Sequence, residues 1–582
     1  MISFCAAAAL SLLACAPPSQ HGPTPLGDPA IPARQPASFA SGWKYPAGAS
    51  ATFAPHALVA SNSALASAAG AEILRAGGNA VDAAVATEFA LAVTYPEAGN
   101  LGGGGFMVIR MADGRTAALD YRETAPLAAT RDMYVGADGK VTSGSLRGPL
   151  ASGVPGAVAG MTEALRKWGS MPLARVMAPA IRLAEEGFVV DSSLARSLKS
   201  SDTLIELYQG KDFFLPNGAP LPVGSPLKQP NLARTLRLIA RDGAHAFYEG
   251  EIAGEIASQM KRDGGLITRE DLRRYRAKWR MPLKVEYRGY TLLMMPPASS
   301  GGITVGETFN ILEAVDSVPQ FGTPSDLHLL ASAYQRAFID RNSKLGDPEF
   351  VQVPVTQLLD KGYARRLAGT IGRGRATPTL SIEPAMREGA ETTHFSVVDA
   401  SGNAVATTTT LNELYGSGVY ITAAGFFMND EMDDFTTKPG SPNLYGLIQG
   451  ETNSIAPGKR MLSAMSPTIV LDPRGRLLMV LGARGGPRII TSVSQVIRNV
   501  IDRRMSLADA MSAPRIHHQA LPDSVRYERS GFGDETLAQL RAMGYGLRPV
   551  DYIGATVVAI MRVSGGYEGM IDPRSRGGAA GF

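Results

Sequence analysis

The chain has 582 residues, of which 45% are hydrophobic and 19% are charged, and its formal net charge is +4. This balance excludes disorder of the whole chain and supplies enough apolar side chains for a large core. No basic run typical of a nucleic-acid-binding surface occurs, so no nucleic-acid partner is expected. The only cysteines are Cys5 and Cys15, which leaves the body without a disulfide, a thiolate metal site or a cysteine nucleophile.

The first fifteen residues are typical of an export signal. An uncharged stretch rich in Ala and Leu, residues 4–14, is too short to span a bilayer and suits a secretory signal. It ends in Leu-Leu-Ala-Cys, which resembles a bacterial lipobox in which Cys15 is lipidated. An ordinary cleaved signal is the alternative. We therefore expect residues 1–15 to be a lipoprotein signal, and the protein to be periplasmic with a membrane tether at Cys15.

The next segment is predicted to be an extended tether. Residues 16–49 contain eight prolines and few large aliphatic side chains, a composition that favours an extended chain over a packed one. We expect the tether to span residues 16–50 and the folded body to begin at Ala51. No later segment is apolar over the ~18 residues that a transmembrane helix needs.

Helix and strand patterns both occur along the body. Residues 61–93 predict two helices separated by a Gly-Gly-Asn sequence, and Tyr95 before a proline ends the second helix. Further patterns predict strands at 106–110 and 116–121. The segment from 151 to 345 is predicted to be mostly helical, with a strand pair at 284–295. An exposed polar loop is predicted at 371–391, followed by mainly strands from 393 to 491. A polar loop of this length inside a body is typically functional or cleaved.

The segment after this loop predicts a β-hairpin. Two runs rich in Val and Thr flank a Ser-Gly-Asn turn that starts at Ser401. If the turn is centred on Ser401, Thr392 lies opposite Thr410, and Asn412 lies on the same face one pleat further along. A shift of one residue would pair Thr393 with Thr410 instead. The expected register gathers two hydroxyls and an amide at one strand end.

A threonine at a strand start, after an exposed loop, permits an unusual nucleophile. If the chain is cut before Thr392, this residue gains a free α-amine that can act as the general base for its own hydroxyl. No histidine is then needed. The alternative is a strand that is rich in threonine only because threonine favours β-structure.

Seven short motifs occur in a fixed order. They are GGNAVDAA at 77–84, GNLGGGGFM at 99–107, PPASSGG at 296–302, TTHFS at 392–396, NDEMDDF at 429–435, LSAMSPT at 462–468 and DPRS at 572–575. Through them the sequence from Ala57 to Phe582 resembles the gamma-glutamyltransferases, also called gamma-glutamyl transpeptidases or glutathione hydrolases. These enzymes are N-terminal nucleophile hydrolases, and they transfer γ-glutamyl groups from glutathione and related compounds to water, amino acids or peptides.

The resemblance implies a fold and a maturation step. The expected fold class is α/β, a four-layer αββα sandwich formed jointly by two subunits of one composite domain. The precursor would cut itself between Glu391 and Thr392. A large subunit at 51–391 and a small catalytic subunit at 392–582 would remain together as a heterodimer. No cofactor and no metal is implied.

The resemblance also implies roles for individual residues. Thr392 would be the nucleophile for self-cleavage and for turnover, and Thr410 would orient it. Gly485 and Gly486 would form the oxyanion hole, since backbone N–H groups reach an oxyanion only where no side chain obstructs them. The donor's α-carboxylate and α-ammonium would be bound by Arg122, Asn412, Glu431, Asp434 and Ser463. Tyr445 would belong to a lid over the bound donor.

The chain departs from the family pattern around the donor site. Ala464 stands where the family usually has a second serine that binds the donor carboxylate. One lost charge-assisted hydrogen bond costs ~1.5–3 kcal/mol of binding. Ala483, Arg484 and Pro487 replace the usual Ser, Pro and Ser around the glycine pair. These changes leave the reaction type intact and bear on donor affinity and specificity.

The sequence also bears on other hydrolase, nucleotide-binding and binding-protein functions. The chain has no Gly-x-Ser-x-Gly elbow and no His-Glu-x-x-His motif, and the glycines at 102–105 lack the Lys-Ser/Thr of a phosphate-binding loop. An unprocessed binding lipoprotein would remain one uncut polypeptide. The surviving rival is a cephalosporin acylase, which removes glutaryl-type groups on the same scaffold. Asp434 opposes it, because a glutaryl group has no ammonium, whereas Ala464 is compatible with it.

Overall fold

Two antiparallel seven-stranded sheets form the centre of the computed structural model, which describes residues 34–315, 317–379 and 392–582. The first sheet has the order β21 (Gly578–Gly581), β2 (Leu58–Ser61), β10 (Thr393–Val398), β11 (Ala404–Thr410), β3 (Gly104–Arg110), β4 (Thr116–Tyr121), β7 (Lys278–Arg280). The second has the order β1 (Thr52–Ala54), β20 (Gly566–Ile571), β19 (Thr556–Val563), β15 (Leu477–Arg484), β14 (Thr468–Leu471), β9 (Tyr290–Met294), β8 (Leu283–Tyr287). Strands β10 and β11 pack against β15 of the other sheet.

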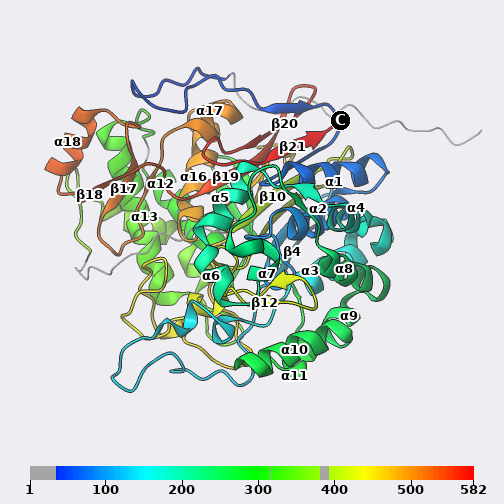
Figure 1. Cartoon of the computed structure of the whole chain (residues 1–582). Coiled ribbons are helices and arrows are strands. Elements are labelled where there is room, and N and C mark those ends of the chain that lie inside the picture. Colours follow the sequence, from blue (N-terminus) through cyan, green and yellow to red (C-terminus); the bar gives the residue numbers. More distant parts are fainter. Residues whose placement is uncertain (1–33, 316, 380–391) are drawn as a thin grey trace, which may run out of the picture.

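Helices cover the outer face of each sheet, so the predicted αββα sandwich is confirmed (Figure 1). The first sheet is covered by α1 (Ala64–Arg75), α2 (Ala80–Thr94) and α3 (Ala157–Trp168), with α4 (Leu173–Glu186) and α8 (Pro230–Asp242) outside them. The second sheet is covered by α12 (Gly301–Glu313), α16 (Arg488–Ile501) and α17 (Leu507–Ser512), with α13 (Pro324–Lys344) packed on α12.

Smaller elements complete the described part of the chain. The remaining helices are α5 (Ser192–Ser200), α6 (Asp202–Leu207), α7 (Lys211–Phe214), α9 (Ala244–Tyr248), α10 (Glu251–Asp263), α11 (Arg269–Arg274), α14 (Val355–Leu358), α15 (Lys361–Gly369) and α18 (Asp534–Ala542). The remaining strands are β5 (Phe188–Val189), β6 (Pro226–Leu227), β12 (Tyr420–Ile421), β13 (Phe426–Phe427), β16 (Ile516–His517), β17 (Val525–Glu528) and β18 (Leu547–Val550). None of the helices in the described ranges is long and apolar enough to cross a membrane.

Helix α2 follows directly from its sequence. The Asn79 side chain accepts hydrogen bonds from the N–H groups of Val81 and Asp82, while Asp82 accepts one from the N–H of Asn79, so the first turn is capped in both directions. All of its residues are buried, because α2 lies between the first sheet and α1, α3 and α4. The helices predicted at 61–93 are therefore confirmed, as are the strand pairs 106–110 with 116–121 and 284–295.

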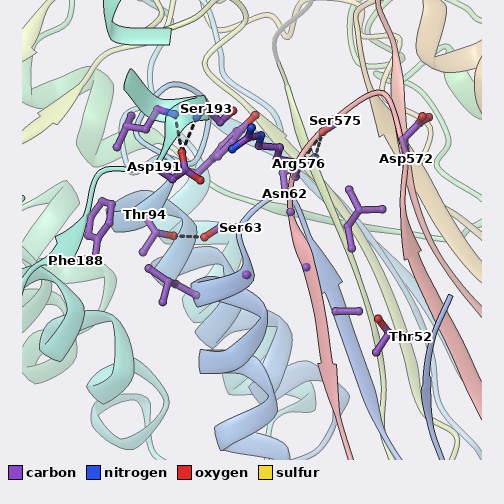
Figure 2. Close-up of a pocket in the computed structure, with 18 of the residues that line it drawn as sticks. Thr52, Asn62, Ser63, Thr94, Phe188, Asp191, Ser193, Asp572, Ser575 and Arg576 are labelled. Carbon is purple, nitrogen blue, oxygen red and sulfur yellow. Dashed lines mark hydrogen bonds between the residues drawn. The ribbon is translucent and has the colours of Figure 1, made fainter. Parts of the chain in front are cut away.

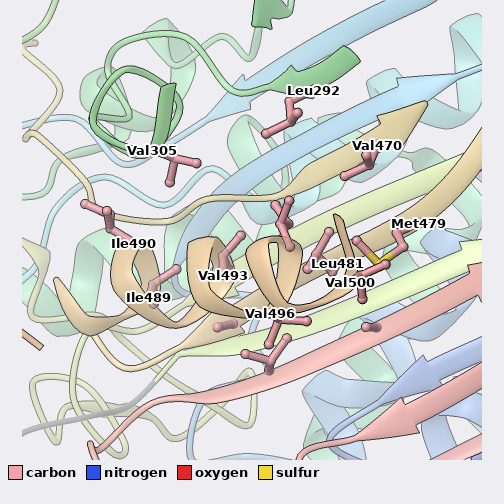
Figure 3. Packing of buried hydrophobic residues seen from close by; sticks show 14 of the residues in the cluster. Leu292, Val305, Val470, Met479, Leu481, Ile489, Ile490, Val493, Val496 and Val500 are labelled. Atoms are coloured by element: carbon pink, nitrogen blue, oxygen red, sulfur yellow. The ribbon is translucent and has the colours of Figure 1, made fainter. Parts of the chain in front are cut away.

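Helix α16 closes the second sheet from outside and places the glycine pair that precedes it. Its apolar side chains, including Val493, Val496 and Val500, pack against Met479 and Leu481 of β15 and their neighbours (Figure 3). Burying side chains of this size stabilises a fold by about 1.5–3 kcal/mol each. The turn at 485–487 between β15 and α16 is therefore held from both ends.

The predicted hairpin register is confirmed. In the pairing of β10 with β11, Thr393 lies opposite Thr409 and His394 lies opposite Thr408. Continued by one residue, this register sets Thr392 against Thr410. Because side chains alternate along a strand, Thr392 and His394 share the face that points toward the second sheet.

The segment expected to be a tether differs from expectation where the structure describes it. Residues 34–50 lie along the body, where the buried indole N–H of Trp43 donates to the carbonyl of Ser512 at 2.9 Å. The guanidinium of Arg574 lies 5.5 Å from the ring centre of Trp43 and 4.9 Å from that of Tyr45. These aromatic contacts outweigh the proline-rich composition, so the packed body begins before Ala51. The expected signal at 1–15, with Cys15, lies outside the described residues.

Replacing Trp43 by alanine removes this buried indole and its hydrogen bond. We expect the free energy of unfolding, measured by urea denaturation, to fall by about 3 kcal/mol. Ser41→Ala alters an exposed residue of the same segment and should change it by less than about 0.5 kcal/mol. Equal stability of the two variants would show that residues 34–50 are not anchored.

Candidate functional site

The site lies at the end of the β10–β11 hairpin, between the two sheets. The hydroxyl of the buried Thr392 donates to the Thr410 hydroxyl, with the two oxygens 3.4 Å apart. Thr410 also accepts the N–H of Asn412 at 2.8 Å. Asn412 has a φ of 81°, in the left-handed region that few non-glycine residues adopt. The chain bends there, directly after β11, so Asn412 contacts Thr410 through its backbone N–H, while all three residues line one cavity.

The neighbouring histidine is a structural residue. His394 is fully buried, and its Nδ1 lies 2.8 Å from the hydroxyl of Thr408. A Cβ at Gly482 of β15 would come within 2.3 Å of the imidazole, so the glycine makes room for the ring between the sheets. Burial lowers the pKa of His394 to about 3, which keeps it neutral. No proton transfer by His394 is needed for a threonine that carries its own amine.

The glycine pair opposite the hairpin requires glycine at both positions. Gly485 has a φ of 126° and Gly486 a φ of 56°. A Cβ at Gly485 would meet the carbonyl oxygen of Gly554 at 2.4 Å, and one at Gly486 would meet the ring of Tyr445 at 2.7 Å. The turn can therefore present backbone N–H groups without an intervening side chain.

Tyr445 covers the site. Its hydroxyl donates to the side-chain oxygen of Asn412 at 2.8 Å, and its carbonyl accepts a hydrogen bond from Gln519 at 3.1 Å. With the ring seated over Gly486, the cavity that remains has a volume of about 20 Å³. This is room for about one water molecule. Tyr445 therefore limits the space that the cavity offers in this conformation.

A buried cluster of charges forms the floor of this cavity. Arg122, which follows β4, contacts Glu431 at 2.7 Å, Glu123 at 3.4 Å and also Asp434. Burial raises the pKa of Glu123 to about 7 and raises those of Glu431 and Asp434, while the charge of Arg122 opposes each shift. Both signs of charge are thus present side by side in a site shielded from water.

The segment that includes Ser463 and Ala464 forms one wall. Its backbone is held by the loop before α12, since Ser300 donates to the carbonyl of Ser463 from both its N–H, at 2.7 Å, and its hydroxyl, at 2.6 Å. The methyl group of Ala464 lines the cavity. The PPASSGG motif thus supports the LSAMSPT motif.

Most residues predicted for the site line this one cavity. They are Arg122, Thr392, Thr410, Asn412, Glu431, Asp434, Tyr445, Ser463 and Gly486. Gly485 adjoins it through Gly486, whereas Glu391, like Cys15, lies outside the described residues. Sequence reasoning missed Arg341 of α13, which also lines the cavity. Its Asp-Arg-Asn context on a helix is typical of a solvated face, so no local signal pointed to it.

A second, larger cavity of about 910 Å³ lies beside the start of β10 (Figure 2). Thr52, Thr94, Asp191 and Arg576 are among the residues that line it, and it contains no residue predicted for the site. Asn62 connects the two regions, because it lines this cavity and accepts a hydrogen bond from the Thr393 hydroxyl at 3.1 Å.

Comparison with known proteins agrees with the geometry. Residues 66–582 match the sequence profile of the family described as gamma-glutamyltranspeptidase. The chain belongs to the gamma-glutamyltranspeptidase family. It is 47% identical to the glutathione hydrolase proenzyme of Escherichia coli (strain K12), with 90% of this chain and 91% of that protein covered.

Acylases occur among the similar proteins as well. This gamma-glutamyltranspeptidase family member is 40% identical to the acylase ACY 1 proenzyme of Pseudomonas sp. (strain V22), over 84% of this chain and 88% of that protein. Its fold is similar to the crystal structure of cephalosporin acylase from Bacillus halodurans, with a TM-score of 0.82 and 29% identity over 93% of this chain and 98% of that one. Fold similarity alone therefore does not identify the donor.

Arg122→Leu is expected to destabilise the protein, because it leaves three buried carboxylates without the guanidinium that contacts them all. The loss should be about 3 kcal/mol at pH 8. It should be smaller at pH 5, because burial already raises the pKa of Glu123 to about 7 and protonation removes uncompensated charge. Free energies of unfolding at both pH values measure the difference.

Arg122→Lys is the matched control for this prediction. It keeps the positive charge and should lose less stability at pH 8 than Arg122→Leu does. A loss for Arg122→Leu that grows on acidification would contradict this account of the cluster.

Proposed function

We propose that the protein is a gamma-glutamyltransferase and glutathione hydrolase, made as a proenzyme that matures by self-cleavage before Thr392. The observation that carries the proposal is one cavity that holds both the Thr392–Thr410 pair and the charges of Arg122 and Asp434. A relative at 47% identity is named a glutathione hydrolase proenzyme, which supports both the reaction and the two-chain mature form.

Maturation begins with the Thr392 hydroxyl. Its oxygen attacks the carbonyl of Glu391, the peptide nitrogen takes up the proton, and the peptide bond becomes an ester. Water then hydrolyses the ester, which leaves a carboxylate on Glu391 and a free α-amine on Thr392. In the uncut chain this nitrogen is an amide and cannot act as a base, so cleavage is what makes the nucleophile competent.

Turnover uses the same oxygen. The α-amine of Thr392 takes the hydroxyl proton while the oxygen attacks the γ-carbonyl of the donor, and the proton passes to the departing amine. The acyl-enzyme is then released by water or by the amine of an amino acid or peptide. Thr410 holds the attacking hydroxyl in place, and Gly485 and Gly486 supply N–H groups to the oxyanion.

In donor recognition, the charged groups of the donor replace the ion pair between Arg122 and Asp434. The α-carboxylate of a γ-glutamyl group takes the place of Asp434 on Arg122, and its α-ammonium then binds Asp434 and Glu431. Ser463 adds a hydrogen bond to the carboxylate. With Tyr445 closed over Gly486, water is kept from the acyl-enzyme, which favours transfer to a bound acceptor amine.

A glutaryl acylase is the second candidate function. The acylases at 40% and 29% identity share the scaffold, and Ala464 is compatible with either donor, because a glutaryl group carries the same terminal carboxylate as a γ-glutamyl group. The buried carboxylates of Asp434 and Glu431 oppose the glutaryl acylase, because a glutaryl group brings no cation to replace Arg122. Charge balance therefore favours the γ-glutamyl donor.

The proposal includes export to the periplasm and attachment to a membrane through Cys15. Its support is the sequence alone, an apolar stretch at 4–14 followed by a lipobox-like Leu-Leu-Ala-Cys. A periplasmic site would give the enzyme access to exported or external γ-glutamyl compounds.

Self-cleavage predicts two fragments from the wild-type chain on a denaturing gel. N-terminal sequencing of the smaller fragment should begin at Thr392. Thr392→Ala should remain one polypeptide, because no hydroxyl is left to attack the peptide bond, and Thr392→Ser should still be cut. An intact wild-type chain, or cleavage of the alanine variant, would contradict the mechanism.

Donor identity is tested by comparing release from γ-glutamyl and glutaryl anilides. We expect the γ-glutamyl anilide to be preferred, and Ala464→Ser to lower its KM about tenfold by adding a hydrogen bond to the α-carboxylate. Ala464→Cys, similar in size but a weak hydrogen-bond donor, is the control and should lower it less. Preference for the glutaryl anilide would support the acylase instead.

A further inference from the structure

A second arginine lies in the same cavity as Arg122 without an anionic partner of its own. Arg341 is fully buried on α13, and its guanidinium donates to Ser300 at 3.0 Å, Asn342 at 2.9 Å and Gln449 at 3.2 Å. All three acceptors are neutral oxygens. Within the described ranges, no carboxylate oxygen lies within ion-pair distance of it. Burying a cation this way is costly unless its charge is used.

The network around Arg341 reaches both halves of the donor site. Gln449, which accepts from Arg341, donates to the backbone carbonyl of Asp434 at 3.3 Å. Ser300, which also accepts from Arg341, donates to the backbone carbonyl of Ser463 at 2.6 Å. Arg341 is therefore connected to Asp434 through Gln449 and to Ser463 through Ser300. Asp434 would bind the ammonium of the donor, and Ser463 its carboxylate.

The carboxylates of this cluster outnumber its cations. Arg122 contacts three buried carboxylates, Glu123, Glu431 and Asp434, and Arg341 supplies the second cation. The other titratable groups that face this cluster are Glu413, Asp430, Asp433 and Tyr445, together with Asp120, Tyr121, Tyr248 and Tyr275 around Glu123. None of these brings a positive charge. Among the described groups around Asp434, the cations are thus Arg122 and Arg341.

We propose that Arg341 is a positioning residue that keeps Asp434 ionised once the donor carboxylate has taken Arg122. The inference rests on the proposed γ-glutamyl donor. When that carboxylate takes Arg122, Asp434 exchanges the guanidinium for the donor ammonium, and the charge of Arg341 adds to that of the ammonium in opposing the effect of burial on Asp434. A protonated Asp434 cannot form an ion pair with the donor ammonium. The charge of Arg341 acts on the pKa of Asp434 in the same direction as that of Arg122, against the effect of burial.

Arg341 remains a cation under working conditions. Burial lowers its pKa only to about 10, and the charge of Asp434 opposes the shift. It is therefore protonated at neutral pH, both before and after the donor binds.

The test compares Arg341→Gln with Arg341→Lys in the processed enzyme, through the pH dependence of kcat for a γ-glutamyl anilide, because kcat reports the groups that titrate in the enzyme–donor complex. The glutamine variant removes the charge, so the acid limb should move to higher pH by at least about one pH unit. Its KM should be raised at least about tenfold at pH 6 and much less at pH 9. The lysine variant loses hydrogen bonds but keeps the charge, so its acid limb should coincide with that of the wild type.

A second neutral variant keeps the test decisive if Arg341→Gln folds poorly. Arg341→Met also removes the charge but keeps a long side chain, so its acid limb should move to higher pH as that of Arg341→Gln does. A purely structural role of Arg341 would shift Arg341→Lys as well, because the lysine also loses hydrogen bonds. An unshifted profile in the neutral variants, or an equal shift in Arg341→Lys, would overturn the inference.

The wild-type enzyme in the same assay distinguishes a failure of the proposed function from a failure of the role proposed for Arg341. Absence of wild-type release from the γ-glutamyl anilide contradicts the proposed function. Wild-type release together with an unshifted Arg341→Gln profile contradicts only the role given to Arg341.

Discussion

The pairing of β10 with β11 is the constraint on which the site depends. Both strands lie in the middle of the first sheet, between β2 and β3, so their register is held from both sides. Because side chains alternate, this register alone decides that Thr392 faces Thr410 and the second sheet. A shift by one residue would turn Thr392 toward the helical layer, away from Gly485 and the charged residues. The backbone ladder thus positions the proposed nucleophile without a dedicated set of side chains.

Burial between two sheets explains the electrostatics of the site. Charges in a dry interior interact strongly but are costly when unpaired. Arg122 is therefore surrounded by carboxylates in the free protein, and a donor that brings one charge of each sign can replace the Arg122–Asp434 contact without leaving a net charge behind. A ligand with only a carboxylate would leave Asp434 uncompensated. Under the proposed function, selectivity for a zwitterionic group would arise from charge balance as much as from shape.

Local patterns were enough to predict much of the fold. The capped helices at 61–93, the strand pairs and the hairpin register follow from periodicity and turn residues that lie close together in sequence. The positions of Thr392 and Thr410 follow from that register. The charged residues of the site could be proposed only through the family resemblance, because each one alone is typical of a solvated surface.

Long-range packing accounts for what local patterns did not predict. Trp43 anchors residues 34–50 against Ser512 and Arg574, partners far away in sequence, so composition alone favoured a free tether. Arg341 reaches the cavity because α13 packs on α12, whose preceding loop supports Ser463. Contacts of this kind depend on the assembled layers and leave no periodic signal in one segment.

An N-terminal nucleophile also suits the rest of this site. A separate general base would add another buried titratable group beside Glu123, Glu431 and Asp434, whose pKa values are already raised by burial. His394, the nearest imidazole on the hairpin, is held neutral between the sheets by the same burial. In the proposed mechanism the α-amine of Thr392 avoids this difficulty, because it would appear only after cleavage and would be covalently fixed to the atom it activates. Such a precursor could fold its charged donor site first and acquire its base afterwards, without having to bury both at once.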